Sequence, residues 1–90
     1  MTEKELSDII IKNAFYYYNA QNTNFPSLVI DKQDYSDFNI TLLKKELNKQ
    51  DFDIIDGTLA PEPFAQMEED FKKKKWFIYQ PPKNDKTEKE

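Results

Sequence analysis

The chain has 90 residues, of which 38% are apolar and 33% are charged, and its formal net charge is −4. A chain of this length forms one small domain with a modest core, which excludes a two-domain enzyme with a cleft between its halves. Because the sequence contains no Cys, no His and no Arg, structural zinc sites, thiol nucleophiles, imidazole bases and disulfide bonds are excluded, and nucleic-acid recognition through Arg is excluded as well.

The first segment predicts a helix from Thr2 to about Gln21. Thr2 and Glu5 have the spacing of a capping box, in which each side chain accepts a bond from the backbone amide of the other residue. Apolar residues then recur at helical spacing in two neighbouring rows: Leu6, Ile10, Ala14, Tyr17 and Ile11, Phe15, Tyr18. The amide-rich stretch 19–24 and the following Phe25-Pro26 pair are expected to end this helix and begin a loop.

The middle of the chain predicts two short strands with a helix between them. Ser27–Ile30 is apolar, contains β-branched residues and is bounded by Pro and Asp, which is typical of a strand. The apolar spacing over Ile40–Leu47 predicts a second helix, which Asp37 or Asn39 could cap. Phe52–Ile55 predicts a second strand, ended by the Asp-Gly pair that contains the single glycine of the sequence.

The C-terminal third predicts one more helix and one more strand. Ala60–Pro63 introduces the helix, because Pro is tolerated in a first turn, and Lys72–Lys75 ends it in the order that the helix dipole favours. Its apolar stripe is narrow and consists of Phe64, Met67 and Phe71. Trp76–Tyr79 predicts the third strand. The segment 83–90 contains no apolar residue and predicts a disordered tail.

These elements predict an α+β fold in the order α-β-α-β-α-β, with three helices packed on a short three-stranded sheet. Residues 1–82 then form a single globular domain, and the charged tail 83–90 follows it. Complete crossovers through the second and third helices would make the strands parallel, whereas a reversal after Gly57 would turn one of them antiparallel, so strand order and direction stay open. A winged-helix-like arrangement is the alternative, since a long first helix, two shorter helices and a late β ribbon suit the same pattern.

Asp31 and Asp56 each follow a predicted strand. If those strands are parallel and adjacent, the two carboxylates meet at one edge of the sheet, in a geometry that holds magnesium or calcium through oxygen. The competing interpretation is that each Asp caps a turn or the next helix. Asp51, Asp53 and Asp56 do not complete a calcium-binding loop, because Ile54-Ile55 interrupts the pattern. We therefore predict no metal site and no cofactor.

Four consecutive aromatic residues, 15–18, lie on the predicted first helix. Four consecutive helical positions span most of a turn, so at least one ring must be exposed. Exposed Tyr beside an amide-rich stretch is typical of a protein-binding surface. We predict that Tyr16 and Tyr18 contact a partner protein, with Asp34 and Asp37 at the rim of the contact. The competing interpretation is that these rings cover the sheet.

Two charged surfaces suggest other functions. The block Lys72–Lys75, followed by Trp76, has the composition of a nucleic-acid contact, although the acidic residues of the same helix and the negative net charge favour a solvated helix end. A set of carboxylates could instead imitate a phosphate backbone and occupy the basic groove of a nucleic-acid-binding protein. This acidic set comprises Asp53, Asp56, Glu62, Glu68, Glu69 and Asp70. The competing interpretation is that these are solubilising charges.

No motif in the sequence identifies a family, and no pair of catalytic groups stands out, so we predict that the protein is not an enzyme. The leading hypothesis is a small acidic protein that binds another protein, as an accessory or inhibitory protein of a phage or mobile element does when it blocks a host or defence protein. Lys at every basic position, which is typical of AT-rich coding, suggests that context. The alternatives are the nucleic-acid mimic and a winged-helix nucleic-acid binder that uses the Lys block.

The expected location is the cytoplasm. The apolar run Ile9–Ile11 is too short to cross a bilayer, and the N-terminus lacks the basic and apolar regions of a secretion signal. The broad apolar stripe of the first helix also leaves room for a homodimer.

Overall fold

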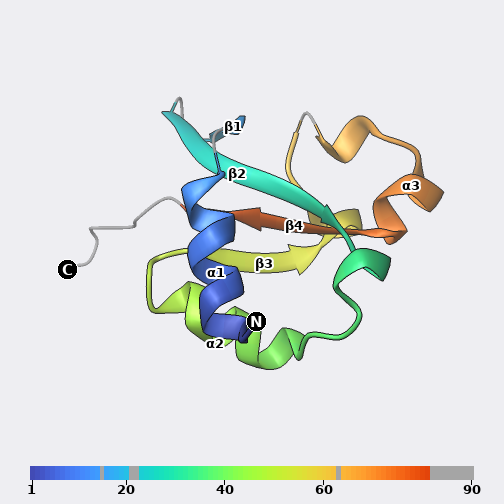
Figure 1. Cartoon of the computed structure of the whole chain (residues 1–90). Helices are drawn as coiled ribbons and strands as arrows, with labels where there is room; N and C mark the ends of the chain where they lie inside the picture. Colours follow the sequence, from blue (N-terminus) through green and yellow to red (C-terminus); the bar gives the residue numbers. More distant parts are fainter. Residues whose placement is uncertain (15, 21–22, 63, 82–90) are drawn as a thin grey trace.

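A four-stranded antiparallel sheet forms the centre of the described part of the chain (Figure 1). The computed structural model describes residues 1–14, 16–20, 23–62 and 64–81, and for 16–20, 23 and 24 it describes the backbone alone. The strands are β1 (Tyr16–Ala20), β2 (Thr23–Asp31), β3 (Asp53–Asp56) and β4 (Lys75–Tyr79). The helices are α1 (Glu3–Lys12), α2 (Ile40–Asn48) and α3 (Glu69–Lys73). Three 3₁₀ turns are η1 (Gln33–Tyr35), η2 (Gly57–Leu59) and η3 (Phe64–Gln66).

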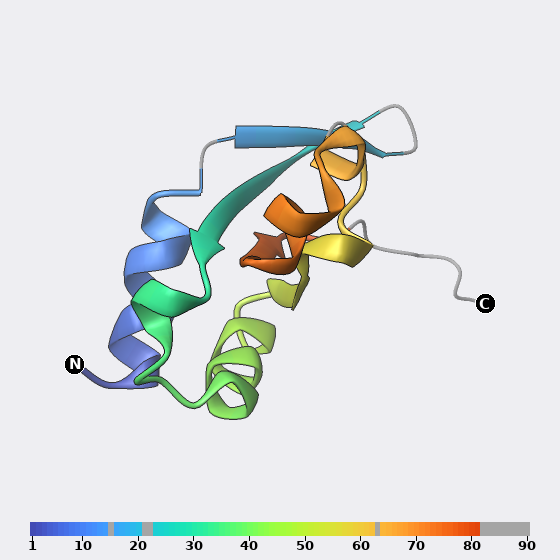
Figure 2. The same cartoon turned by 90° about the vertical axis from the view of Figure 1, so that its right-hand side faces the viewer.

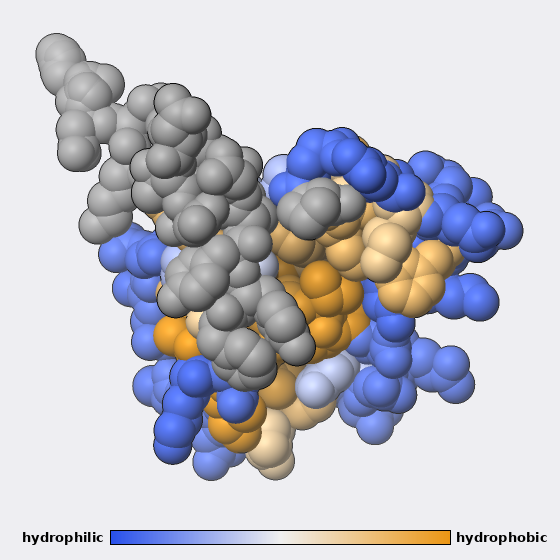
Figure 3. Space-filling model, turned by 90° about the horizontal axis from the view of Figure 1, so that it is seen from above, coloured by the Kyte–Doolittle hydropathy of each residue, from blue (hydrophilic) through white to orange (hydrophobic). Residues whose placement is uncertain are grey.

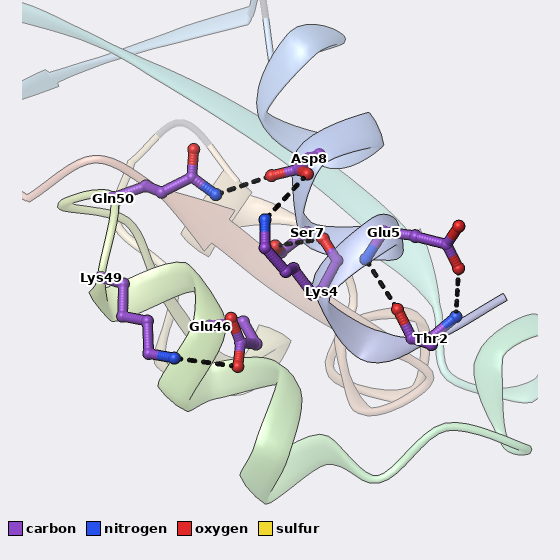
Figure 4. Close-up of polar contacts among 8 residues, drawn as sticks. All are labelled: Thr2, Lys4, Glu5, Ser7, Asp8, Glu46, Lys49 and Gln50. Atoms are coloured by element: carbon purple, nitrogen blue, oxygen red, sulfur yellow. Dashed lines mark hydrogen bonds and ion pairs between the residues drawn. The ribbon is translucent and has the colours of Figure 1, made fainter.

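The first helix begins where the sequence predicts. The Glu5 amide donates to Thr2 Oγ1 at 3.1 Å, and the Thr2 amide donates to Glu5 Oε1 at 2.8 Å (Figure 4). These two bonds satisfy amide groups that the first turn of a helix leaves without a partner. Hydrogen bonding to the carboxylate from the Thr2 amide, followed by that from the Thr2 side chain, lowers the pKa of Glu5 below its ordinary value. The capping box is therefore confirmed.

The first helix ends earlier than predicted. α1 stops at Lys12 instead of near Gln21, and its last turn tightens: the Asn13 amide donates to the carbonyls of Ile9 and Ile10, both at 3.1 Å, and the Ala14 amide donates to that of Ile11 at 3.2 Å. Asn13 Nδ2 also donates to the Ile9 carbonyl, at 2.8 Å. The aromatic run that follows is a better strand former than helix former, and β2 offers it a ladder of backbone partners. Tyr16–Ala20 is therefore the strand β1, and the sheet gains a strand beyond the three predicted.

The second helix agrees with its prediction. Asn39 is the N-cap, and its Oδ1 accepts the amide of Leu42 at 3.1 Å. At the other end, the amide of Phe52 donates to the carbonyl of Leu47 at 3.0 Å, while Asp51 adopts a positive φ of 67°. This is the geometry of a Schellman motif, which satisfies the last carbonyls of a helix and turns the chain into β3.

The helices α1 and α2 lie side by side and are joined at both ends. The Asn39 amide donates to Glu3 Oε2 at 2.9 Å. Figure 4 shows the second bond, in which Gln50 Nε2 donates to Asp8 Oδ1 at 2.9 Å. The bond from Gln50 is the main cause of a lowered pKa at Asp8. These polar contacts fix the relative position of the two helices above the sheet.

The strands β2 and β3 run in the same direction, because each pairs antiparallel with β4, which lies between them. α2 connects β2 to β3, so β2-α2-β3 is a split β-α-β unit with β4 inserted at its centre (Figure 1). β1 extends the sheet on the outer side of β2. The α+β class and the alternation of helices with strands are confirmed. The winged-helix-like alternative is not the arrangement found, since a four-stranded sheet forms the centre of the described residues.

Side chains alternate between the two faces of the sheet, and the buried residues that the structure describes are divided unequally between these faces. α1 and α2 cover one face, where the main core consists of Leu6, Ile10, Ile30, Leu43, Leu47, Phe52, Ile54 and Ile78. The segment 57–73 covers the other face, where Ala60 and Phe77 are the buried apolar residues among those described. Half-buried neighbours surround this pair: Phe25, Val29, Ile55, Phe64 and Tyr79. Figure 2 shows the sheet between the two layers.

The third predicted helix, from Ala60 to Lys75, is not continuous. The interruption falls at Met67 and Glu68, where Glu68 has an extended backbone with ψ of 144°; the two prolines lie in the predicted first turn, which tolerates them. The segment instead forms η2, η3 and the short α3, and it folds back until η2 touches the end of α3. At that contact a Cβ on residue 57 would overlap the carbonyl oxygen of Lys72 and lie 3.0 Å from that of Lys75. The single glycine therefore allows a close approach between backbones.

Candidate functional site

Three strand ends meet at one end of the sheet, on the right of Figure 1. β2 ends at Asp31 and β3 ends at Asp56, and the register places these residues opposite Lys75 and Trp76, where β4 begins. The sequence predicted that the two carboxylates would meet if their strands were parallel and adjacent. The strands are parallel, but they are not adjacent, because β4 separates them.

Each of the two carboxylates forms an ion pair with a lysine ammonium group. Lys32 Nζ donates to Asp56 Oδ2 at 2.6 Å, and Lys75 Nζ pairs with Asp31 Oδ1. Hydrogen bonding from Lys32, followed by that from the Thr58 amide, lowers the pKa of Asp56 to about 2. Hydrogen bonding from Lys75 lowers the pKa of Asp31 in the same way. Both carboxylates are thus held ionised by lysine at neutral pH.

The fold places no third metal ligand beside Asp31 and Asp56 among the residues described, so it does not support a divalent-ion site there. Within the described residues, no three acidic, His or Cys side chains gather closely enough to hold a metal ion. A cation at either carboxylate would have to displace the lysine already bound there, at a cost in stability. The two ion pairs, Asp31 with Lys75 and Asp56 with Lys32, therefore stabilise this end of the sheet.

An open cavity of about 500 Å³ lies beside these ion pairs, between η1 and the α3–β4 junction. Its lining consists of Asp31, Lys32, Gln33, Asp34, Phe71, Lys73, Lys74 and Lys75. Lys75 Nζ lies 4.6 Å from the centre of the Phe71 ring, which is 40% exposed. Lys32 Nζ lies at the same distance from the centre of the Trp76 ring. The cavity therefore combines basic groups with aromatic surface.

The lysine block is divided between structural and exposed positions. Lys72 is buried, and its Nζ donates to the carbonyl of Ala65 at 2.8 Å and pairs with Glu69 at 3.3 Å. Lys75 is paired with an aspartate, as described above. Lys73 and Lys74 are exposed and line the cavity. The block is thus neither a uniform basic strip nor a plain solvated helix end.

Apolar side chains are exposed in the segment that follows β3, and one of them, Phe71, also lines the cavity; we call this set the apolar strip. We define it by three exposed side chains of the segment 57–73, Leu59, Met67 and Phe71, which are 71%, 49% and 40% exposed. The ring centre of Phe71 lies 6.1 Å from that of Phe64, which lies 5.9 Å from that of Phe77. These three rings thus connect Phe71 at the surface with the buried cluster of Ala60 and Phe77. Figure 3 shows apolar surface at the centre of this view, with hydrophilic residues to its left and right.

The structure places the predicted partner-binding residues differently. Tyr16 and Tyr18 belong to β1, opposite Ser27 and Phe25, and their side chains lie outside the described part of the chain. The prediction that they lie on a helix is wrong, because α1 has already ended. Their contact with a partner stays a prediction. Asp34 lies on η1 and lines the cavity, and Asp37 is exposed in the loop before α2.

The acidic set does not form one continuous row of unpaired carboxylates. Three of its members bind lysine: Asp53 pairs with Lys44, Asp56 with Lys32 and Glu69 with Lys72. The other three are exposed: Glu62, Glu68 and Asp70. A mimic of nucleic acid needs carboxylates that are available to a basic groove, and the ion pairs reduce their number.

Sequence reasoning missed the exposure of the apolar strip. It assigned Met67 and Phe71 to a narrow helical stripe, and a stripe of this kind normally faces a core. The helix is interrupted between η3 and α3, and both side chains are left at the surface. The narrowness of the stripe was the available signal, since a buried helix presents a broader apolar face.

No protein-family model, curated protein or solved structure matches the chain. Among the residues described, no helix has the length and hydropathy that crossing a bilayer requires. Function must therefore be argued from the site itself.

Proposed function

We propose that the protein is a non-enzymatic binding module that contacts another protein through the apolar strip of Leu59, Met67 and Phe71. The observation that carries this proposal is the unequal closure of the sheet. Among the residues whose side chains the structure describes, eight buried ones close the face under α1 and α2, whereas two, Ala60 and Phe77, lie under the segment that bears the strip. Apolar groups that a small domain leaves together at its surface commonly mark a contact with another molecule.

The chemistry of the strip supports a protein partner. Phe and Met are enriched in the buried centres of protein interfaces, because they supply large apolar area and adapt to the opposing surface. Exposed charged residues are chain neighbours of two strip members, Glu68 of Met67 and Asp70 of Phe71, and a polar rim around an apolar centre is the usual anatomy of such an interface. Fully burying one such side chain contributes about 1.5–3 kcal/mol, so these three could act as anchors within a larger contact.

The setting proposed for this activity follows from composition. Lys at all thirteen basic positions and the absence of Cys support an AT-rich host and a reducing compartment, and we place the protein in the cytoplasm. An accessory or inhibitory protein of a phage or mobile element, which blocks a host or defence protein by occupying its surface, suits a module of this size.

Affinity capture tests the proposal. Tagged full-length protein is incubated with lysate of a low-GC bacterium, with and without nuclease, and washed at low salt and at about 0.5 M salt, where screening shortens to a few ångström. The strip variant carries Leu59→Ser and Met67→Ser. The control variant carries Ile9→Ser and Leu42→Ser, which alter residues of similar exposure on α1 and α2 (44% and 41%).

We expect a nuclease-resistant partner that survives the high-salt wash, that the control variant retains and that the strip variant loses. Equal retention by both variants would overturn the strip as the contact surface. Loss of the partner on nuclease treatment would overturn a protein partner. Sedimentation of the purified chain distinguishes a second copy: a dimer that the strip variant abolishes would assign the strip to self-association instead.

A further inference from the structure

The cavity beside the apolar strip has a charge opposite to that of the whole chain. Four lysines and two aspartates line it, whereas the chain carries a formal net charge of −4. Asp31 and Asp34 are the acidic residues of the lining. Asp56, which pairs with Lys32, lies outside it. Positive charge that is concentrated at one place on an acidic protein attracts anionic groups to that place, while the acidic remainder of the surface repels them.

Two of the four lysines are available to a ligand. Lys32 and Lys75 are engaged by Asp56 and Asp31. No ion pair within the described residues engages Lys73 or Lys74, and both are exposed. They follow each other at the end of α3, on the side that lines the cavity. The cavity is therefore lined by two consecutive lysines without an ion pair among the described residues and by the 40% exposed side chain of Phe71.

Phe71 belongs both to the apolar strip and to the lining of the cavity, so one ligand can contact the two together. We infer that the cavity receives the carboxylates of an acidic peptide segment of the partner, while apolar residues of that segment lie on the strip. This inference rests on the proposed function and names the chemistry of its partner. Carboxylates suit lysine ammonium groups as charge-assisted acceptors, and the neighbouring ring supplies apolar contact.

The shape and charge of the cavity favour a peptide over other anions. A small-molecule site normally encloses most of its ligand, whereas this cavity is open and lies at the surface. A nucleic acid would bring a long row of phosphates against Asp34 at the edge of the cavity and against a chain that is acidic elsewhere. A short segment with a few carboxylates meets the two lysines without that repulsion.

Selection from a library of random peptides tests the inference. The full-length chain is the bait, and the readout is the composition of the selected peptides, followed by fluorescence anisotropy of representative labelled peptides. The cavity variant carries Lys73→Glu and Lys74→Glu. The control variant carries Lys12→Glu and Lys45→Glu, which reverse two exposed lysines on α1 and α2 and change the net charge equally. Labelled single-stranded oligothymidylate is measured in parallel.

We expect selected peptides to be enriched in Asp and Glu next to apolar residues. The cavity variant should bind them about tenfold more weakly or worse, with the control variant close to wild type, because reversal turns attraction into repulsion. An empty selection, peptides without acidic enrichment, or equal weakening in both variants would overturn the inference. Tighter binding of oligothymidylate than of any peptide would overturn it in favour of a nucleic acid.

The two experiments distinguish a failure of this inference from a failure of the proposed function. If the captured protein partner is lost by the strip variant but kept by the cavity variant, the proposed function stands and the acidic-peptide inference fails. If the acidic peptides bind through Lys73 and Lys74 but no protein partner depends on Leu59 and Met67, the cavity is supported as a peptide-binding site, and the strip is overturned as the contact surface of the proposed function.

Discussion

The Lys32 ammonium and the Asp56 carboxylate join the ends of β2 and β3 across β4 through a 2.6 Å hydrogen bond. The same ammonium lies 4.6 Å from the centre of the Trp76 ring, which belongs to the strand between them. The side chains of Lys32 and Asp56 are 28% and 36% exposed, so water screens part of their attraction. The pair ties together strands that are not neighbours in the sheet.

The first prediction concerns acid stability. The pKa of Asp56 is lowered from 3.8 to about 2. A carboxylate with a lower pKa in the folded state adds stability above its unfolded pKa, and this stability is lost as the pH falls through the folded value. We therefore predict a fall in melting temperature between about pH 4 and pH 2. Asp56→Asn should flatten this fall and cost about 1 kcal/mol at neutral pH after allowance for screening.

Circular dichroism during heating, repeated across that pH range, measures this effect. Asn at position 56 still offers an oxygen to the Thr58 amide, so the substitution isolates the charge. Asp37→Asn, in an exposed loop, is the control and should keep the wild-type profile. An unchanged pH profile in the Asp56→Asn variant would show that the pair does not couple stability to pH.

The second prediction concerns the close approach at Gly57. Alanine at this position would push its Cβ against the backbone carbonyl of Lys72, and a backbone atom cannot move aside as a flexible side chain can. Gly57→Ala should destabilise the protein by about 1–3 kcal/mol, as overpacking does. Urea denaturation measures the change, with Leu59→Ala, two residues away and 71% exposed, as the control. A neutral Gly57→Ala variant would contradict the tight contact between η2 and α3.

The third prediction uses two adjacent leucines of α2. Leu43 is fully buried in the main core, whereas Leu42 is 41% exposed. Leu43→Ala should cost about 2–5 kcal/mol because it leaves a cavity in the core, and Leu42→Ala should cost well under half of that. Both variants keep helix propensity, so urea denaturation compares burial alone. Equal losses would mean that α2 is rotated about its axis relative to the arrangement described.

The fourth prediction divides the lysine block. Lys72→Gln removes an ammonium that bonds the carbonyl of Ala65 from a buried position, and the shorter side chain leaves that carbonyl without its donor. We expect a loss of about 1–2 kcal/mol. Lys73→Gln, at an exposed neighbour, should change stability by about 0.5 kcal/mol or less. Thermal unfolding of the two variants measures the difference, and comparable losses would contradict a structural role confined to Lys72.

Local sequence chemistry located most of the elements. The capping box at Thr2 and Glu5, the Asn39 cap with the leucine spacing of α2, and the strand composition of residues 27–30 and 76–79 all depend on neighbours within a few positions. Such signals act through backbone bonds and the alternation of apolar residues, so they can be read before the chain is folded.

The candidate site was predictable in part. Asp31, Asp34, Asp56 and the lysine block stood out from the sequence, and the fold brings them to one end of the sheet. Their mutual pairing could not be foreseen, because it depends on β4 lying between β2 and β3. The role given to Tyr16 and Tyr18 stays a prediction.

The sequence by itself determined that this is an α+β chain without zinc, thiol or imidazole chemistry, since composition and short-range periodicity suffice for those conclusions. Tertiary structure alone decided that the segment 16–20, which begins with three tyrosines, is a strand, that β4 separates β2 from β3, and that Phe71 is partly exposed at the cavity. The reason is physical: an aromatic run suits either a helix or a strand, and the choice depends on which distant segment supplies its hydrogen bonds and covers its side chains.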